Sequence, residues 1–166
     1  MPPTYRERLR AEGLTLAACG AAGSAGLLVL KTEQATRWPW NTIGQLAVVA
    51  GLLGWLGPRS VRRSIESATE LSPGGEGSGE PTPLWQLPLI VAGLTATFVG
   101  LEEVNTRAGW DAGLRITGGC TLVGLAQAFL LERRVAADED ERGRSYFRLK
   151  GSRLGRGTRL GYVPRG

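Results

Sequence analysis

Four long apolar runs, separated by segments that hold nearly all the charge, most constrain how this chain can fold. The first run is uncharged for 18 residues from Gly13 to Leu30, and a helix needs roughly 20 residues to cross a bilayer core of about 30 Å. The pattern predicts an all-α membrane protein, in which four transmembrane helices form a four-helix bundle. The later runs extend from Thr42 to Gly57, from Leu84 to Leu101 and from Ala112 to Leu131.

The residues before the first run allow a second interpretation. Arg6, Arg8 and Arg10 precede it, and a basic start followed by an apolar run is also typical of a signal peptide. No small-x-small cleavage pattern follows Leu30, and the run belongs to an internal repeat. An uncleaved first span is therefore the better interpretation.

A short motif, E-x-x-T-R-x-x-W-[N/D], occurs twice at an offset of 70 residues, each time between two apolar runs. Nine of the 33 residues from position 22 to position 54 are identical at this offset, and they include Trp, Arg and Glu in fixed order. We interpret this as a duplication. It predicts two tandem hairpins, arranged as parallel repeats about a pseudo-two-fold axis along the membrane normal.

Basic residues are distributed unevenly along the chain. Sixteen of the 20 Lys and Arg residues lie in residues 1–13, in the segment after the second run or after Leu131, and four lie in or near the two motif segments. Cytoplasmic loops of membrane proteins carry the excess of basic residues. We therefore expect a multi-pass protein of the cell membrane, with both termini cytoplasmic and both motifs outside.

These patterns divide the chain into four parts. Residues 1–71 are predicted to form the first two-span hairpin, with its basic N-terminus, and residues 84–134 the second. Residues 72–83 are rich in Gly, Ser and Pro, which is typical of a flexible linker. Residues 135–166 form a charged, Arg/Gly-rich cytoplasmic tail.

Small residues at helical spacing predict where the spans approach one another closely. One such face lies in the first run and another in the third. Their members are Ala18, Ala22 and Gly26, and Ala92, Ala96 and Gly100.

The repeated motif holds the candidate residues for a ligand or partner site. On a continuous helix its Glu, Arg and Trp lie at i, i+4 and i+7 and share one face. In the structural interpretation, which we favour, each Glu pairs with its Arg and each Trp anchors the interface. In the functional interpretation, both copies meet at the pseudo-axis and frame an outward-facing polar site for a zwitterion, a lipid headgroup or a partner's loop. The candidates are Glu33, Thr36, Arg37, Trp40, Glu103, Thr106, Arg107 and Trp110.

The basic tail has three interpretations. It attracts anionic lipid at the cytoplasmic face, at about 1 kcal/mol per base near the surface; it is merely solvated; or it forms a β-hairpin, residues 146–149 against 160–163, docked on a partner. A nucleic-acid-binding role is disfavoured, because the tail resembles nucleic-acid-binding tails only in its composition of arginine, glycine and aromatic residues. The candidate lipid- or partner-binding residues are Arg144, Arg148, Lys150, Arg153, Arg156 and Arg159.

The residue types present give no support for catalysis. Histidine is absent, and Cys19 and Cys120 lie in separate apolar runs, where small buried residues are a better interpretation than a metal or disulfide pair. No nucleophile–base pattern or metal-ligand cluster is visible in the sequence. We predict no enzyme activity, no cofactor and no metal.

The sequence leaves two functions open. The first is a non-enzymatic binding or assembly subunit of a membrane complex, whose partners are the lipid bilayer and other membrane subunits or further copies of the chain. The alternative is a small oligomeric transporter or channel, with an outward-facing site built from the motif. Several polar residues facing the bundle interior at mid-depth would favour transport, whereas their absence would favour assembly.

Overall fold

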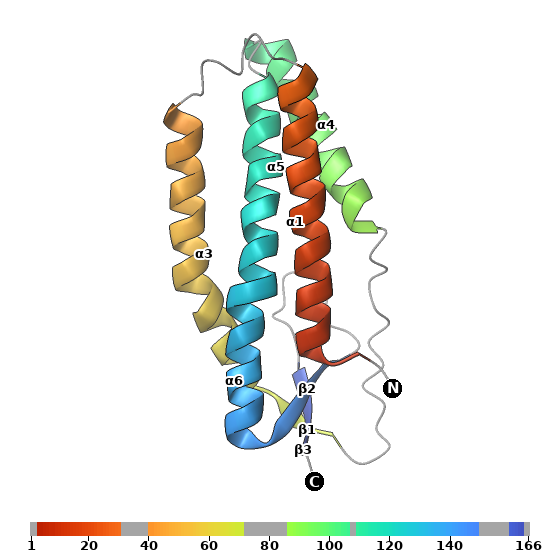
Figure 1. The fold of residues 1–166 in the computed structure, drawn as a ribbon, viewed down its shortest axis with the longest axis vertical. Coiled ribbons are helices and arrows are strands. Elements are labelled where there is room, and N and C mark those ends of the chain that lie inside the picture. Colours follow the sequence, from red (N-terminus) through yellow and green to blue (C-terminus); the bar gives the residue numbers. More distant parts are fainter. Residues whose placement is uncertain (1–2, 31–39, 72–85, 107–108, 150–159, 165–166) are drawn as a thin grey trace.

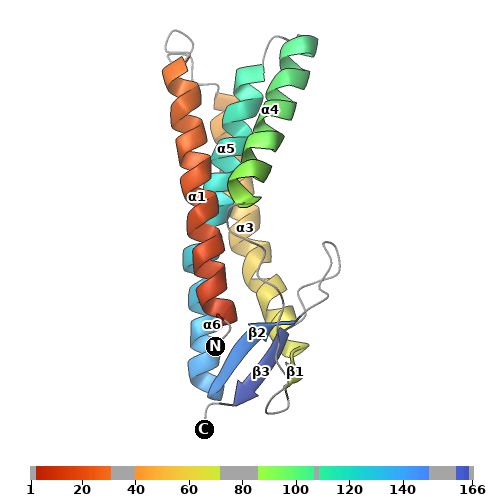
Figure 2. The ribbon, with the colours of Figure 1, turned by 90° about the vertical axis from the view of Figure 1, so that its right-hand side faces the viewer.

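The computed structural model describes residues 3–30, 40–71, 86–106, 109–149 and 160–164. It is mostly helical, and its long helices run up and down beside one another (Figure 1). A small sheet lies at one end of the bundle, where both chain termini also lie (Figures 1 and 2). The helices are α1 (Tyr5–Leu30), α3 (Trp40–Glu66), α4 (Gln86–Thr106), α5 (Gly109–Leu125), the π-helix η1 (Ala126–Leu131) and α6 (Glu132–Arg142), and the strands are β1 (Thr69–Glu70), β2 (Arg144–Arg148) and β3 (Leu160–Pro164).

Local sequence signals explain where several helices begin and end. At the start of α1, the Thr4 hydroxyl accepts the Glu7 N–H at 3.3 Å, and the Glu7 carboxylate accepts the Thr4 N–H at 2.9 Å, which is a capping box. Pro88 lies in the first turn of α4, where proline is tolerated because the N–H groups of that turn have no helical partner. Gly143 ends α6 in the left-handed conformation, with φ of 58°, which glycine adopts without a steric penalty.

Helix α3 extends further than the sequence suggested. Pro58 directly follows the second apolar run, where a proline is expected to end the helix, but it lies inside α3, which continues to Glu66. Proline removes one helical hydrogen bond. The residues after Pro58 offset this lost hydrogen bond by burying apolar side chains. Val61 and Ile65 are only 4% and 6% exposed.

Among the described residues, two helical stretches are long and apolar enough to cross a membrane: Tyr5–Val29 and Ala112–Arg142. Residues Gln86–Thr97 of α4 form a shorter apolar stretch. Large apolar side chains on these and the other long helices point outward, including Val29, Val48, Leu89 and Phe129.

Helices α1 and α5 pack through a seam of small residues. On α1 the seam consists of Gly13, Ala17, Gly20 and Ser24, and on α5 and η1 of Thr117, Thr121, Gly124 and Ala128. Both sets repeat at spacings of four, three and four residues, which keeps them on one face of each helix. A Cβ atom on Gly20 would lie 2.5 Å from the Thr117 carbonyl oxygen, so the two backbones are nearly in contact.

The predicted small-residue faces are wrong. In the first run Ala18, Ala22 and Gly26 are exposed, and in the third run Ala92, Ala96 and Gly100 are exposed too. A Cβ atom on Gly26 or Gly100 would meet nothing within 4 Å. Both faces of α1 carry small residues, but only the observed one meets a matching small-residue face on α5. Spacing alone therefore identified close-packing residue types but not the face that uses them.

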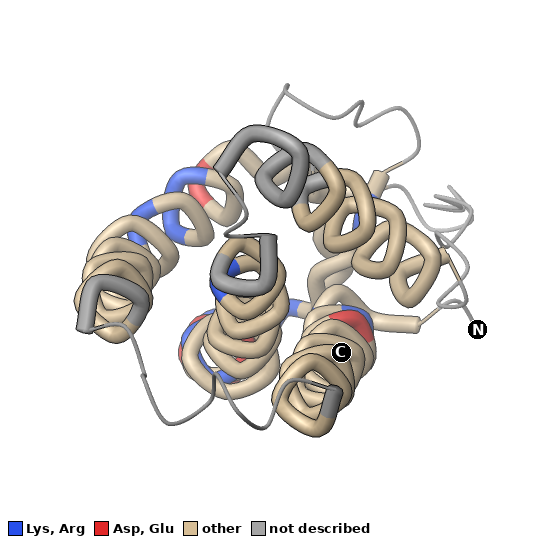
Figure 3. Tube along the Cα trace, turned by 90° about the horizontal axis from the view of Figure 1, so that it is seen from above, with Lys and Arg blue, Asp and Glu red and all other residues tan. Residues whose placement is uncertain are grey.

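Helix α5 is the centre of the bundle. It contacts α1, α3 and α4, and it lies between the other helices when viewed along the bundle (Figure 3). Among the described residues, α3 packs mainly against α5, η1 and α6, although the repeat makes α3 the counterpart of α5. This packing does not display two equivalent hairpins, so the pseudo-two-fold arrangement remains a prediction.

Candidate functional site

The helix ends that flank the two motif copies in the sequence, the end of α1, the start of α3, the end of α4 and the start of α5, lie at the end of the bundle opposite the sheet (Figure 1). Glu33, Thr36, Arg37 and Arg107 are outside the described residues. Trp40, Glu103, Thr106 and Trp110 fall within described helices, but their side chains are outside the part that the structure describes. The meeting of the two motif copies at the pseudo-axis therefore stays a prediction.

The end of the molecule that carries the sheet holds a cluster of buried apolar side chains. We call this cluster the basal core: Tyr5, Leu9, Val61, Ile65, Val135, Tyr146 and Leu160. Its members come from α1, α3, α6, β2 and β3. Residues from both ends of the chain therefore pack together in one cluster. Val135 and Leu160 have no exposed surface, and Tyr146 is 1% exposed.

A polar network fixes Tyr146 within the basal core. The buried Glu139 carboxylate accepts the Tyr146 backbone N–H at 3.0 Å. The Tyr146 hydroxyl donates to an Asp138 carboxylate oxygen at 2.6 Å, and Arg142 pairs with the other Asp138 oxygen at 3.1 Å. Burial together with the hydrogen bond to Asp138 raises the pKa of the Tyr146 phenol to about 12.

This raised pKa predicts a loss of stability at alkaline pH. The folded state holds the Tyr146 proton more tightly than the unfolded chain, whose tyrosine pKa is about 10. The contribution is therefore complete below about pH 10 and is lost as the pH rises through about 12. We expect Tyr146→Phe to remove this part of the pH dependence, as followed by chemical unfolding at pH 9, 10, 11 and 12. A pH profile of the same shape in Tyr146→Phe would contradict the assignment.

The tail contains a folded hairpin. Strand β2 pairs antiparallel with β3, with Tyr146 opposite Tyr162 and Arg148 opposite Leu160. This agrees with the predicted strand pair, but strand β2 docks on α1 and α6 of the same chain. Strand β1, which follows α3, adds parallel to β3, so the sheet order is β1-β3-β2.

The predicted lipid-binding residues divide into two groups. Arg144 and Arg148 lie on β2, where the Arg144 guanidinium stacks 4.3 Å from the centre of the Tyr162 ring. Arg148 lies 3.9 Å from the Glu12 carboxylate of α1. These two residues therefore contribute to a folded module, which consists of α6, the three-stranded sheet and the basal core. Lys150, Arg153, Arg156 and Arg159 lie between β2 and β3, outside the described residues.

Ion pairs connect α1 to this module. Arg6 pairs with the largely buried Glu132 at the start of α6, and Arg8 pairs with Glu12 at 2.6 Å within α1. Because Glu132 directly follows the apolar residues of η1, the Arg6–Glu132 pair marks the border between apolar bundle and charged module.

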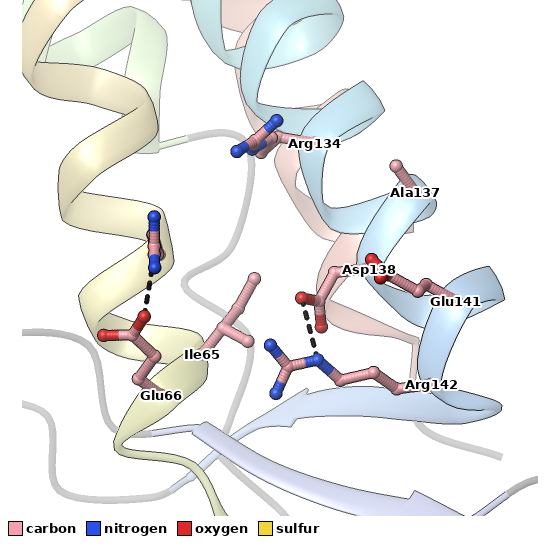
Figure 4. A pocket seen from close by; sticks show the side chains of 8 residues that line it. Ile65, Glu66, Arg134, Ala137, Asp138, Glu141 and Arg142 are labelled. Atoms are coloured by element: carbon pink, nitrogen blue, oxygen red, sulfur yellow. Dashed lines mark hydrogen bonds and ion pairs between the residues drawn. The ribbon is translucent and has the colours of Figure 1, made fainter.

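A cleft of about 190 Å³ opens between the ends of α3 and α6 (Figure 4). Its charged lining consists of three arginines and three acids, and two of the possible ion pairs are formed: Arg62–Glu66 at 2.7 Å and Asp138–Arg142 at 3.1 Å. The lining residues are Arg62, Ile65 and Glu66 of α3, and Arg134, Ala137, Asp138, Glu141 and Arg142 of α6.

Polar groups within the bundle are mostly paired. The Ser24 and Thr117 hydroxyls bond to each other at 2.8 Å, and the Thr121 hydroxyl donates to the Thr117 carbonyl oxygen at 3.0 Å. Among the described residues, the Arg115 Nε and the Thr95 hydroxyl are buried without a hydrogen-bond partner. Arg115 lies near the start of the fourth apolar run, where an arginine is expected to extend its charge to the membrane interface, but its Nε is enclosed.

Sequence reasoning missed the basal core and the cleft. Signals were present: the T-x-x-E pattern of Thr4 to Glu7 starts α1, and Val135, Asp138, Glu139 and Arg142 recur at helical spacing. The described residues contain no group of three or more Cys, Asp or Glu side chains that would hold a metal ion. Comparison of the chain with protein-family models, with curated proteins and with solved structures found no match.

Proposed function

We propose that this protein is a multi-pass protein of the cell membrane, in which the helical bundle crosses the bilayer and the basal core forms a folded cytoplasmic module. In the apolar windows of Tyr5–Val29 and Ala112–Arg142, only 17% and 22% of the residues are buried. The core helix of a soluble protein would be mostly buried, so this outward-facing apolar surface is the observation that carries the proposal.

The ends of the helices support the same placement. Trp55 of α3 is 58% exposed, and the Arg59 guanidinium lies 4.3 Å from the centre of its ring. A tryptophan beside an arginine is typical of a membrane–water interface. Both residues lie toward the end of α3 that carries the module, and the sixteen-to-four distribution of basic residues assigns this end to the cytoplasm.

Within the membrane complex, we assign the chain the role of a binding or assembly subunit. The hydroxyls of Ser24, Thr117 and Thr121 are used in hydrogen bonds between and within helices. By number alone these polar residues within the bundle would favour transport. Because their hydroxyls are used in hydrogen bonds of the protein itself, we infer that they serve packing, and we keep the assembly role. The contact surfaces in this proposal are the motif segments on the outside and the basic residues between β2 and β3 on the inside.

Purification in mild detergent, followed by mass spectrometry of bound proteins, tests this role. We expect the wild type to retain a membrane protein partner or a second copy, and the combined Arg37→Ala and Arg107→Ala variant to lose it at a temperature where both stay folded. A monomer without bound protein would contradict the assembly role. The unpaired Arg115 Nε is the observation that favours the transport alternative, and solute flux into liposomes that is lost in Arg115→Leu would establish it.

A further inference from the structure

We propose that the cleft between α3 and α6 binds the zwitterionic headgroup of phosphatidylethanolamine, with its phosphate at Arg134 and its ammonium group at Glu141. This inference rests on the proposed membrane placement, because the lipid would reach the cleft from the cytoplasmic leaflet. The motif and tail candidates lie elsewhere in the chain.

The cleft lies at the depth of a lipid headgroup. Phe129 and Leu130 of η1 are about half exposed and belong to the apolar surface. Arg134 follows Leu130 by four residues, about 6 Å at a rise of 1.5 Å per residue. On the facing helix, Arg62 follows the Trp55–Arg59 pair within one turn. The cleft therefore begins where the apolar surface ends.

Its charges match a zwitterion better than an anion. The arginines and acids of the lining balance, so the cleft has no net charge. Arg62 is held by Glu66, while Arg142 and the Tyr146 hydroxyl both engage Asp138. Among the described residues, Arg134 and Glu141 have no hydrogen-bond or ion-pair partner. One cation and one anion are thus left for a ligand.

The two groups are also ordered along the helix. Arg134 and Glu141 lie seven residues apart on the same face of α6, with Ala137 between them, and Arg134 is nearer the apolar bundle. Figure 4 shows Arg134 extending across the upper part of the cleft toward α3. The small Ala137 side chain leaves room between the two charges. A headgroup entering from the bilayer would meet Arg134 with its phosphate first and Glu141 with its ammonium group beyond.

The volume restricts the ligand further. Pockets for drug-sized molecules measure about 300–1,000 Å³, whereas this cleft measures about 190 Å³. Such a space suits a compact headgroup better than a sugar-bearing one. Guanidinium–phosphate and carboxylate–ammonium contacts are both charge-assisted, and each is stronger than a neutral hydrogen bond.

Native mass spectrometry of the full chain in detergent, with lipids of identical acyl chains, tests the proposal. We expect phosphatidylethanolamine to be retained about tenfold better than phosphatidylcholine, whose methylated nitrogen donates no hydrogen bond, or phosphatidylglycerol, which lacks the cation. Glu141→Gln removes the ammonium contact and should abolish this preference, whereas Arg134→Gln removes the phosphate contact common to the three lipids and should lower the retention of all of them. Arg133→Gln is the matched control, because Arg133 is exposed but does not line the cleft, and it should retain the preference.

Equal retention of the three lipids, or equal losses in Arg133→Gln and Arg134→Gln, would overturn the proposal. Displacement of the lipid by an equal concentration of soluble glycerophosphoethanolamine would show that the site recognises the free headgroup, and would overturn the lipid assignment. Carbonate extraction of cell membranes separates this question from the proposed function. A chain that resists extraction but shows no lipid preference leaves the membrane placement intact and removes only the headgroup site.

Discussion

Replacing Gly124 by alanine should destabilise the bundle by about 3 kcal/mol, the upper end of the usual cost of overpacking. A Cβ atom at this position would lie 2.4 Å from the Ala17 nitrogen and 2.5 Å from the Gly13 carbonyl oxygen. Both are backbone atoms of α1, so no side-chain rotation relieves the clash, and the two helices must separate. We expect the melting temperature in detergent to fall by about 6–12 °C.

Gly119→Ala is the matched control for this prediction. Gly119 lies on the same helix, and a Cβ atom there would meet nothing within 4 Å. Because alanine restricts the unfolded chain more than glycine does, this variant should be neutral or stabilised by about 0.5–1 kcal/mol. Equal melting temperatures for Gly124→Ala and Gly119→Ala would mean that α1 and α5 do not pack through the small-residue seam.

Replacing Tyr146 by alanine should release the hairpin from the basal core. The ring is 1% exposed and meets the Tyr162 ring edge to face at a centroid distance of 6.5 Å. Removing a buried aromatic side chain typically costs about 3–5 kcal/mol. The variant also loses the hydroxyl contact to Asp138, which leaves that carboxylate with Arg142.

Limited trypsin digestion in detergent measures this release, because β2 and the segment after it contain several arginines. We expect Tyr146→Ala to be cut within residues 144–159 much faster than the wild type, while the helical content of the bundle is retained. Phe147→Ala is the control, since neighbouring strand residues point to opposite faces and Phe147 is only half-buried. Equal cleavage of the two variants would show that Tyr146 does not anchor the hairpin.

The helices themselves were predictable from the apolar runs, because burial in lipid or protein demands uninterrupted stretches of apolar residues and internal backbone hydrogen bonds. The described helices α1, α4 and α5 overlap the first, third and fourth runs. The end of α3 was not predictable from Pro58 alone. Contacts of Val61 and Ile65 with residues distant in sequence determine where that helix ends.

The basal core was also not predictable from local sequence patterns, because its residues are distant from one another in the sequence. Tyr5 and Leu160 lie at opposite ends of the chain, and neither lies in an apolar run of useful length. The hairpin was predictable only as one of three alternatives, because Arg and Gly dominate the tail composition and strand β2 (RSYFR) shows no alternation of polar and apolar residues. The cleft depends on the alignment of α3 with α6, which no spacing within either helix specifies.

Cysteine labelling in intact cells tests the central claim, the membrane placement, most directly. Single cysteines replace Gly77 and Ala35 in a chain whose own Cys19 and Cys120 are changed to alanine, and a membrane-impermeant maleimide is added before or after the cells are permeabilised. We predict that Ala35→Cys reacts in intact cells and that Gly77→Cys reacts only after permeabilisation. Labelling of both positions from the same side, or recovery of the chain in the soluble fraction without detergent, would contradict the account.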